Sequence, residues 1–150
     1  MIQLLRTTSE HPDFIALVKS LDAYLAVTDG DEHAFYNQYN KIDMIKHVVL
    51  AYENDIAIGC GAIKAFGDDA MEVKRMFVAE AGRNKGIAST LLKELEHWAT
   101  ELGFKRCMLE TGKRQAEAIA LYKKNGYQVT ENYGQYIGVA NSVCFEKVLA

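Results

Sequence analysis

Residues 71–88, MEVKRMFVAEAGRNKGIA, carry the strongest structural signal in this chain, because they read as a strand, a basic turn and the start of a helix. Apolar and β-branched side chains favour a strand over 71–79. A helix that begins at Ala88 directs its unpaired N–H groups and the positive end of its dipole back into the turn. Gly86 lets the backbone approach an anion closely. The segment therefore predicts a phosphate-binding turn over 83–88.

Two motifs connect the chain to a known family. The turn Arg83-Asn84-Lys85-Gly86-Ile87-Ala88 resembles the R/Q-x-x-G-x-G/A signature of the GNAT superfamily of acyl-CoA-dependent N-acyltransferases. Residues 115–127, QAEAIALYKKNGY, are similar to the later motif of that family, N-x-x-A-x-x-L-Y-x-K-x-G-F/Y, with Gln115 where asparagine is usual. The order and spacing of both motifs agree with the family, and the resemblance extends from about residue 47 to the end of the chain.

The resemblance implies an α/β fold with an α+β mixed sheet of about seven strands and about four helices. In this GNAT-like fold the parallel central strands, expected here at 71–79 and 105–111, splay apart and leave a gap for the cofactor. A length of 150 residues and a hydrophobic content of 49% suit one globular domain over residues 1–150.

Apolar periodicity and turn residues predict the elements in chain order. The helix that follows the basic turn is expected to bury one apolar stripe, Leu91, Leu92, Leu95, Ala99 and Leu102, and to end at Gly103. The other expected elements are a strand at 2–6, an amphipathic helix after Pro12, a helix from His33 to about Asp43, a hairpin of 47–53 and 56–66 around Asn54-Asp55, a strand at 105–111, a helix at 116–125, and strands near 127–132 and 141–149.

The cofactor implied by the resemblance is acetyl-CoA, bound as a co-substrate. Its pyrophosphate would lie on the turn and helix start, which comprise Arg83, Asn84, Lys85, Gly86, Ile87 and Ala88. Its pantetheine arm would pair with backbone groups of Phe77 and Val78 in the manner of an added strand. Gln115 and Tyr122, in the later motif, would complete the cofactor contacts.

Attack of an amine on a thioester poses two proton tasks, because the ammonium must lose a proton and the departing thiolate must be stabilised or protonated. The resemblance places the general acid at Tyr122, whose phenol can donate to the sulfur. Glu72 is the best candidate for the general base, because GNAT enzymes often carry a carboxylate on this strand. The alternative for Glu72 is a structural pair with Lys74 or with a neighbouring strand.

Strict alternation along the strand at 71–79 predicts two faces: Glu72, Lys74 and Met76 on one, and Val73, Arg75 and Phe77 on the other. Arg75 is unusual inside an apolar strand. It either anchors a substrate carboxylate by bidentate contact or belongs to an ion pair on the sheet, the interpretation we favour. Glu110, in the facing strand, is a candidate partner for Arg75 or an alternative base.

Family resemblance assigns acceptor choice to the segment Asp29 to Tyr39 and to the loop Tyr133 to Tyr136. Acidic residues in and beside the first segment predict attraction of a cationic amine, and the aromatic residues there offer ring faces for cation–π contact with it. A solvated acidic turn with core tyrosines is the alternative. The substrate-binding candidates are Tyr24, Tyr36, Arg75, Glu110 and Tyr136.

Charge and composition argue against several classes of function. A net charge of −3 gives no general attraction to nucleic acid or anionic lipid. No apolar run approaches the ~20 residues of a membrane span, so we expect a cytoplasmic protein. Cys60, Cys107 and Cys144 lie far apart in apolar contexts, which predicts buried free thiols and no metal site.

These observations predict an N-acetyltransferase that transfers an acetyl group from acetyl-CoA to a primary amine by direct attack in a ternary complex. A small amine or an amino acid is the favoured acceptor, and a protein N-terminus or lysine is the alternative. A non-catalytic acyl-CoA-binding sensor or regulatory module is the rival function. An exposed edge strand near the C-terminus is a candidate contact for a homodimer, by analogy with relatives in the family.

Overall fold

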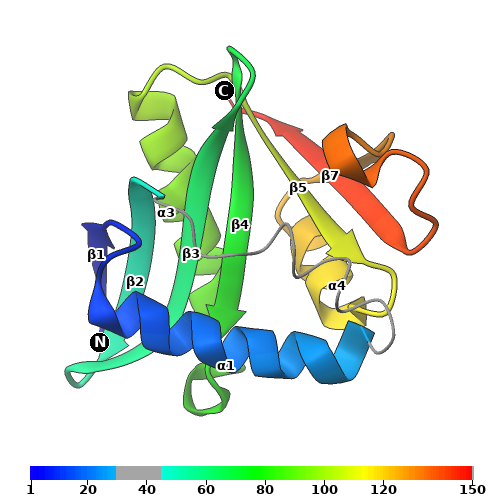
Figure 1. The fold of residues 1–150 in the computed structure, drawn as a ribbon. Helices are drawn as coiled ribbons and strands as arrows, with labels where there is room; N and C mark the ends of the chain where they lie inside the picture. Colours follow the sequence, from blue (N-terminus) through cyan, green and yellow to red (C-terminus); the bar gives the residue numbers. More distant parts are fainter. Residues whose placement is uncertain (30–44, 150) are drawn as a thin grey trace.

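The computed structural model describes residues 1–29 and 45–149. Within these residues, seven strands form one mixed sheet in the order β1-β2-β3-β4-β5-β7-β6, accompanied by three α-helices (Figure 1). The elements are β1 (Ile2–Thr7), α1 (Pro12–Asp29), β2 (His47–Glu53), β3 (Ile56–Phe66), β4 (Ala70–Val78), the 3-10 turn η2 (Glu80–Gly82), α3 (Ile87–Glu101), β5 (Arg106–Gly112), α4 (Ala116–Lys124), β6 (Gln128–Thr130), the 3-10 turn η3 (Gly134–Tyr136) and β7 (Ser142–Val148). The predicted mixed sheet of about seven strands is confirmed, and the helix expected from His33 to about Asp43 lies outside the described residues.

Helices cover both faces of the sheet, with α1 on one face and α3 on the other (Figure 1). The face under α1 is closed by a cluster that comprises Phe14, Leu17, Val18, Ile45, Val48, Leu50, Cys60 and Ala62. The larger cluster on the α3 face includes Leu91, Leu92 and Leu95 of the helix. The predicted apolar stripes of both helices therefore face the sheet, as amphipathic helices require.

Local sequence signals set the ends of several elements. Asn54 and Asp55 have φ values of 51° and 65°, as the two-residue turn of the β2–β3 hairpin requires. Helix α3 begins at Ile87, one residue before the predicted start, and Gly103 follows it with a φ of 91°. The expected burial of Leu102 is wrong: this residue is the C-cap of the helix and is 42% exposed, and Phe104 packs against the core cluster instead.

Strands β4 and β5 part before their carboxyl ends. Their parallel pairing comprises Ala70 with Arg106, Met71 with Cys107 and Glu72 with Met108, although β4 continues to Val78 and β5 to Gly112. The predicted splay of the central parallel strands is therefore confirmed. Open α/β sheets bind ligands at the carboxyl ends of such strands, so the gap is the natural place for a site.

A β-bulge interrupts the pairing of β3 with β4. Ala62 pairs with Lys74 and Cys60 with Phe77, so the single residue Gly61 faces two residues of β4, Arg75 and Met76. Arg75 has a φ of 59°, a left-handed conformation that residues other than glycine rarely adopt. Strained backbone of this kind costs on the order of 1–3 kcal/mol and is commonest at ligand sites.

The bulge corrects the alternation predicted for β4. Met76 packs with Val73 in the cluster under α3, whereas Phe77 joins the cluster under α1. Strict alternation predicts the reverse, with Met76 on the face of Lys74 and Phe77 on the face of Val73. It fails because it counts one residue of β4 for each residue of the partner strand, and the bulge adds one. A Cβ atom at Gly61 would lie 2.5 Å from Met76 Sδ, so the glycine leaves room for Met76 on its new face.

Candidate active site

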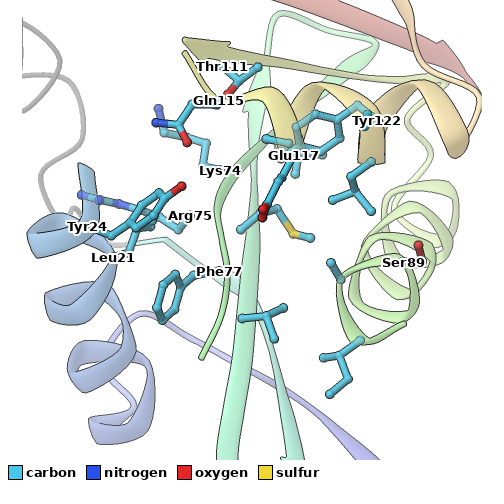
Figure 2. Close-up of a pocket in the computed structure, with 18 of the residues that line it drawn as sticks. Leu21, Tyr24, Lys74, Arg75, Phe77, Ser89, Thr111, Gln115, Glu117 and Tyr122 are labelled. Atoms are coloured by element: carbon cyan, nitrogen blue, oxygen red, sulfur yellow. The ribbon is translucent and has the colours of Figure 1, made fainter. Parts of the chain in front are cut away.

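One cavity of about 650 Å³ lies where β4 and β5 part. Its α1-side lining includes Leu21, Tyr24 and Phe77, and its α3-side lining includes Ile87 and Ser89 (Figure 2). The cavity thus draws lining residues from both faces of the sheet. A cavity of this size and position can hold two substrates that approach from opposite sides.

The α3-side mouth has the features of an anion cradle. Gly86 has a φ of 74°, and a Cβ atom built on it would meet nothing within 4 Å. No side chain caps the start of α3, so its first N–H groups remain available to a ligand. Of the six predicted cofactor residues in the turn, those that line the cavity are Arg83, Asn84, Gly86, Ile87 and Ala88.

Lys85 is the turn residue that the cavity lining does not include. Its Nζ donates to Oε1 of Glu53, the last residue of β2, at 2.7 Å. Arg83 lies closer to the site, and its Nε donates to the carbonyl of Val78 at 3.3 Å. The basic charge of the turn is therefore divided between the cavity mouth and an ion pair at the surface.

Tyr122 lies on α4 with its side chain at the cavity (Figure 2). It is 7% exposed and packs against the rings of Tyr127 and Phe145. Burial, and to a lesser degree the charge of Glu110, raise the pKa of the Tyr122 phenol above its ordinary value. The hydroxyl therefore stays protonated at neutral pH, which is the state required of a hydrogen-bond donor or acid.

Glu72 is a buried carboxylate held by two polar partners. Its Oε2 accepts a hydrogen bond from the Tyr133 hydroxyl at 2.7 Å, and its Oε1 lies 3.6 Å from Lys74 Nζ. The predicted Glu72–Lys74 pair is therefore present. Glu72 and Lys74 also line the cavity, so the carboxylate of Glu72 is paired with Lys74 and can still meet a ligand in the cavity. Burial and the charge of Glu72 raise the pKa of the Tyr133 phenol, which keeps it a donor.

Arg75 forms the ion pair that the sequence favoured, but with a different partner. Its Nη1 donates to Asp22 Oδ1 on α1 at 2.8 Å, and its side chain is 2% exposed. The expected partner Glu110 instead accepts a hydrogen bond from Ser142 at 2.7 Å. The expected partner is wrong because β4 and β5 no longer pair at the level of Arg75, whereas Asp22 of α1 lies within hydrogen-bond distance of the guanidinium.

The remaining predicted site residues gather at the same place. Those that line the cavity are Tyr24, Phe77, Val78, Glu110, Gln115 and Tyr136. Tyr36 lies outside the described residues. The side chain of Gln115 is buried, and its Nε2 has no hydrogen-bond partner among the residues that the structure describes.

Sequence reasoning missed several cavity residues. The helix after Pro12 was predicted only as amphipathic, and Leu21 and Leu25 were not named as site candidates, yet both line the cavity. Tyr133 was placed in a substrate loop but was not linked to Glu72, from which it is separated by 61 positions. The i, i+2 spacing of Glu72 and Lys74 was a usable signal that Lys74 shares the same surface. For the contact of Tyr133 with Glu72 the sequence held no local signal.

Cys60, Cys107 and Cys144 are free and buried. Burial raises the pKa of Cys60 and Cys107 to about 12 and that of Cys144 to about 11. At about pH 8 the folded chain therefore keeps them as thiols, whereas an unfolded cysteine with a pKa of ~8.5 is partly ionised. We expect an aromatic disulfide reagent to leave the native protein almost unreacted and to detect three thiols after unfolding in guanidinium. Fast reaction of any thiol in the native protein would contradict this burial.

Parted parallel strands, a cavity that joins both faces and an anion cradle at one mouth are together the build of an acyl-CoA-dependent transferase. The sequence profile of the acetyltransferase (GNAT) family matches residues 14–127. An IAA acetyltransferase from Azospirillum brasilense is 31% identical over 137 residues, which are 90% of this chain and 90% of that protein. The chain belongs to the acetyltransferase (GNAT) family, and the predicted acyltransferase class is confirmed.

Solved structures agree with this assignment. A Klebsiella pneumoniae protein assigned as an acyl-CoA N-acyltransferase superposes with a TM-score of 0.84 at 30% identity, covering 100% of this chain and 99% of that one. A GNAT family acetyltransferase from Elizabethkingia anophelis, solved with acetyl-CoA bound, gives a TM-score of 0.69 at 22% identity, with coverage of 99% and 98%. The second likeness shows the shared fold alone.

Over residues 1–29 and 45–149, no helix is long and apolar enough to cross a membrane. The same residues contain no group of three or more His, Cys, Asp or Glu side chains that could hold a metal ion.

Proposed function

We propose that this protein transfers the acetyl group of acetyl-CoA to a primary amine by direct attack in a ternary complex, with a small amine or an amino acid as the acceptor. The observation that carries the proposal is that one continuous cavity is lined by residues from both faces of the sheet. Such a cavity lets the cofactor enter from the α3 side while the acceptor enters from the α1 side. Both substrates can then meet where β4 and β5 part, and no acyl-enzyme is required.

The cofactor is assigned to the α3-side mouth, because the residues there fit a pyrophosphate. The left-handed Gly86 and the uncapped start of α3 present backbone N–H groups to an anion. Arg83 adds positive charge beside them. The edge of β4 that faces β5 is unpaired beyond Glu72, and along it Phe77 and Val78 are assigned to offer backbone groups to the amides of the pantetheine arm. Gln115 Nε2 is a further donor at the cavity.

Transfer forms a bond between the amine nitrogen and the acetyl carbon and breaks the carbon–sulfur bond. The acceptor ammonium loses two protons in total, of which one ends on the thiol and one is released. Glu72 is assigned to receive a proton from the ammonium, directly or through water. Tyr122 is assigned to donate to the departing sulfur, and its raised pKa keeps the proton available. A backbone N–H of β4 would stabilise negative charge on the acetyl oxygen.

The test is the release of free thiol from acetyl-CoA across a panel of amines, amino acids and peptides. We expect release that depends on the amine, and the accepted members of the panel then define the acceptor class. The buried cysteines keep the background of this assay low. Tight binding of coenzyme A without release on any acceptor would overturn the proposed transfer, and absence of binding would overturn the assigned cofactor site.

Three narrower expectations stay predictions. These are the single domain over residues 1–150, the cytoplasmic location and the homodimer. The sheet edge nearest the C-terminus is β6, a strand of three residues. A light-scattering mass of the purified protein decides between monomer and dimer.

A further inference from the structure

Arg75 presents a bidentate donor edge that has no protein partner among the described residues. Its Nη1 donates to Asp22, whereas Nε and Nη2 are buried without a hydrogen-bond partner. Nε and Nη2 form the side-on edge of the guanidinium, and their parallel N–H groups match the two oxygens of a carboxylate. Buried donors are almost always paired in native proteins, so this edge calls for an acceptor from outside the described chain.

The unpaired donors are concentrated at the cavity. Among the described residues, four buried side-chain nitrogens lack a partner, and three of them belong to the cavity-lining residues Arg75 and Gln115. All three are donors, so the groups that complete them carry oxygen acceptors. The ligand expected at Arg75 is therefore an anion or a carbonyl compound, and the planar pair of N–H groups favours a carboxylate.

The position of Arg75 separates this ligand from the cofactor. Arg75 pairs with Asp22 of α1, and Figure 2 shows its side chain directed toward that helix, on the opposite side of the cavity from Ser89 and α3. The pyrophosphate turn lies at the start of α3. The carboxylate that meets Arg75 therefore belongs to the acceptor and not to the coenzyme.

The backbone gives a second, independent indication. Without the bulge, alternation would direct Arg75 with Val73 toward α3. The left-handed φ of 59° at Arg75 instead brings its guanidinium to the α1 side. A strained residue that carries a buried, half-paired charge into a cavity is typical of a ligand site.

We propose that Arg75 binds the carboxylate of the acceptor, which makes the acceptor an amino acid or a related aminocarboxylate. This inference rests on the proposed acetyl transfer. Glu72 and Glu110 line the same cavity and attract the ammonium end, so both ends of a zwitterion meet opposite charges. Asp22 orients the guanidinium through Nη1 and leaves the side-on edge to the ligand. Tyr24, which is 43% exposed, lines the α1 side of the same cavity.

The test compares three acceptors: the best amino acid of the panel, its carboxamide and the amine that lacks the carboxyl group. We expect kcat/KM for the acid to exceed that for the amide by roughly ten- to hundredfold, the range of a charged bidentate contact. Arg75→Lys keeps the charge but not the planar edge, so it should remove most of this preference by raising KM for the acid. For the amide, kcat/KM should differ between Arg75→Lys and the wild-type protein by less than about threefold.

Asp22→Asn is the matched control, because it breaks the same ion pair from the other side. If Arg75 binds the acceptor, Asp22→Asn leaves KM for the acid as it is or lowers it, since the amide oxygen can still accept from Nη1 and the negative charge that repels the ligand carboxylate is gone. If both variants lose kcat/KM equally for the acid and for the amide, the Arg75–Asp22 pair has only a structural role, and the inference is overturned. Equal use of acid and amide by the wild-type protein would overturn it as well, even if Arg75→Lys does not fold.

A binding measurement separates failure of this inference from failure of the proposed function. An N-acetyl amino acid is added to the protein saturated with coenzyme A, and the melting temperature is recorded. Stabilisation that Arg75→Lys removes supports the carboxylate site even if no acceptor on the panel is acetylated. Transfer to amines without any effect of the carboxylate leaves the proposed function standing and overturns the assignment of Arg75.

Discussion

Tyr122→Phe should lower kcat for acetyl transfer at least tenfold, within the roughly 10²–10⁴ that a positioned acid contributes. The substitution removes one hydroxyl from a side chain that is 7% exposed and keeps the ring packing with Tyr127 and Phe145. The Tyr122 hydroxyl is expected to contact the sulfur of the coenzyme mainly in the transition state. The dissociation constant of coenzyme A should therefore change little. The measurement is steady-state thiol release together with calorimetric titration of coenzyme A.

Tyr127→Phe is the matched control for this prediction. Tyr127 is also a buried tyrosine next to Tyr122, but its hydroxyl donates to Glu96 at 3.0 Å and does not line the cavity. Its loss should reduce stability by about 1–3 kcal/mol and leave kcat within a factor of about three. Unchanged kcat in Tyr122→Phe would contradict the acid assignment, and equal losses in both variants would indicate a structural effect.

Gly86→Val should raise the dissociation constant of coenzyme A at least about tenfold. Gly86 has a φ of 74°, which a β-branched residue adopts only with strain, so the turn must move and its N–H groups leave the anion. The effect comes from the backbone alone, because a Cβ atom at this position meets nothing within 4 Å. Calorimetric titration of coenzyme A into the variant measures the change.

Gly67→Val separates the site effect from the cost of strain. Gly67 has a φ of 71° and equally open surroundings, but it lies in the turn between β3 and β4, outside the cavity lining. Both variants should lose about 1–2 kcal/mol of stability in thermal unfolding. Only Gly86→Val should weaken the binding of coenzyme A. Equal affinity in the two variants would mean that the turn over residues 83–88 does not hold the cofactor.

The bulge at Arg75 and Met76 shows where sequence reasoning stopped. Period-two alternation assigned the faces of β4 correctly as far as Lys74 and incorrectly from Arg75 to Phe77. Two glycines in β3, Gly59 and Gly61, were a usable signal, because a glycine inside a strand often marks a bulge or a close approach. Their position across from β4 became visible only with the strand register.

The pairing of Arg75 with Asp22 illustrates a different limit. The sequence indicated that a buried arginine needs an anionic partner, but 53 positions separate the two residues. Glu110 was the nearest acid on the expected neighbouring strand, but β4 and β5 do not pair beyond Glu72, and Asp22 of α1 accepts from Arg75 instead. Which carboxylate a buried guanidinium meets depends on how α1 crosses the sheet, and no local pattern encodes that crossing.

The sequence by itself determined the order of strands and helices, the β2–β3 turn, the end of α3 and the family signature. Each of these depends on residues within one or two turns of chain: side-chain periodicity, positive φ at Asn54 and Gly103, and the unpaired N–H groups after Gly86. The tertiary structure alone decided which groups share the cavity. Glu72 meets Tyr133 and Arg75 meets Asp22 because packed layers bring distant segments together, and a single bulge sets the direction of the side chains between them.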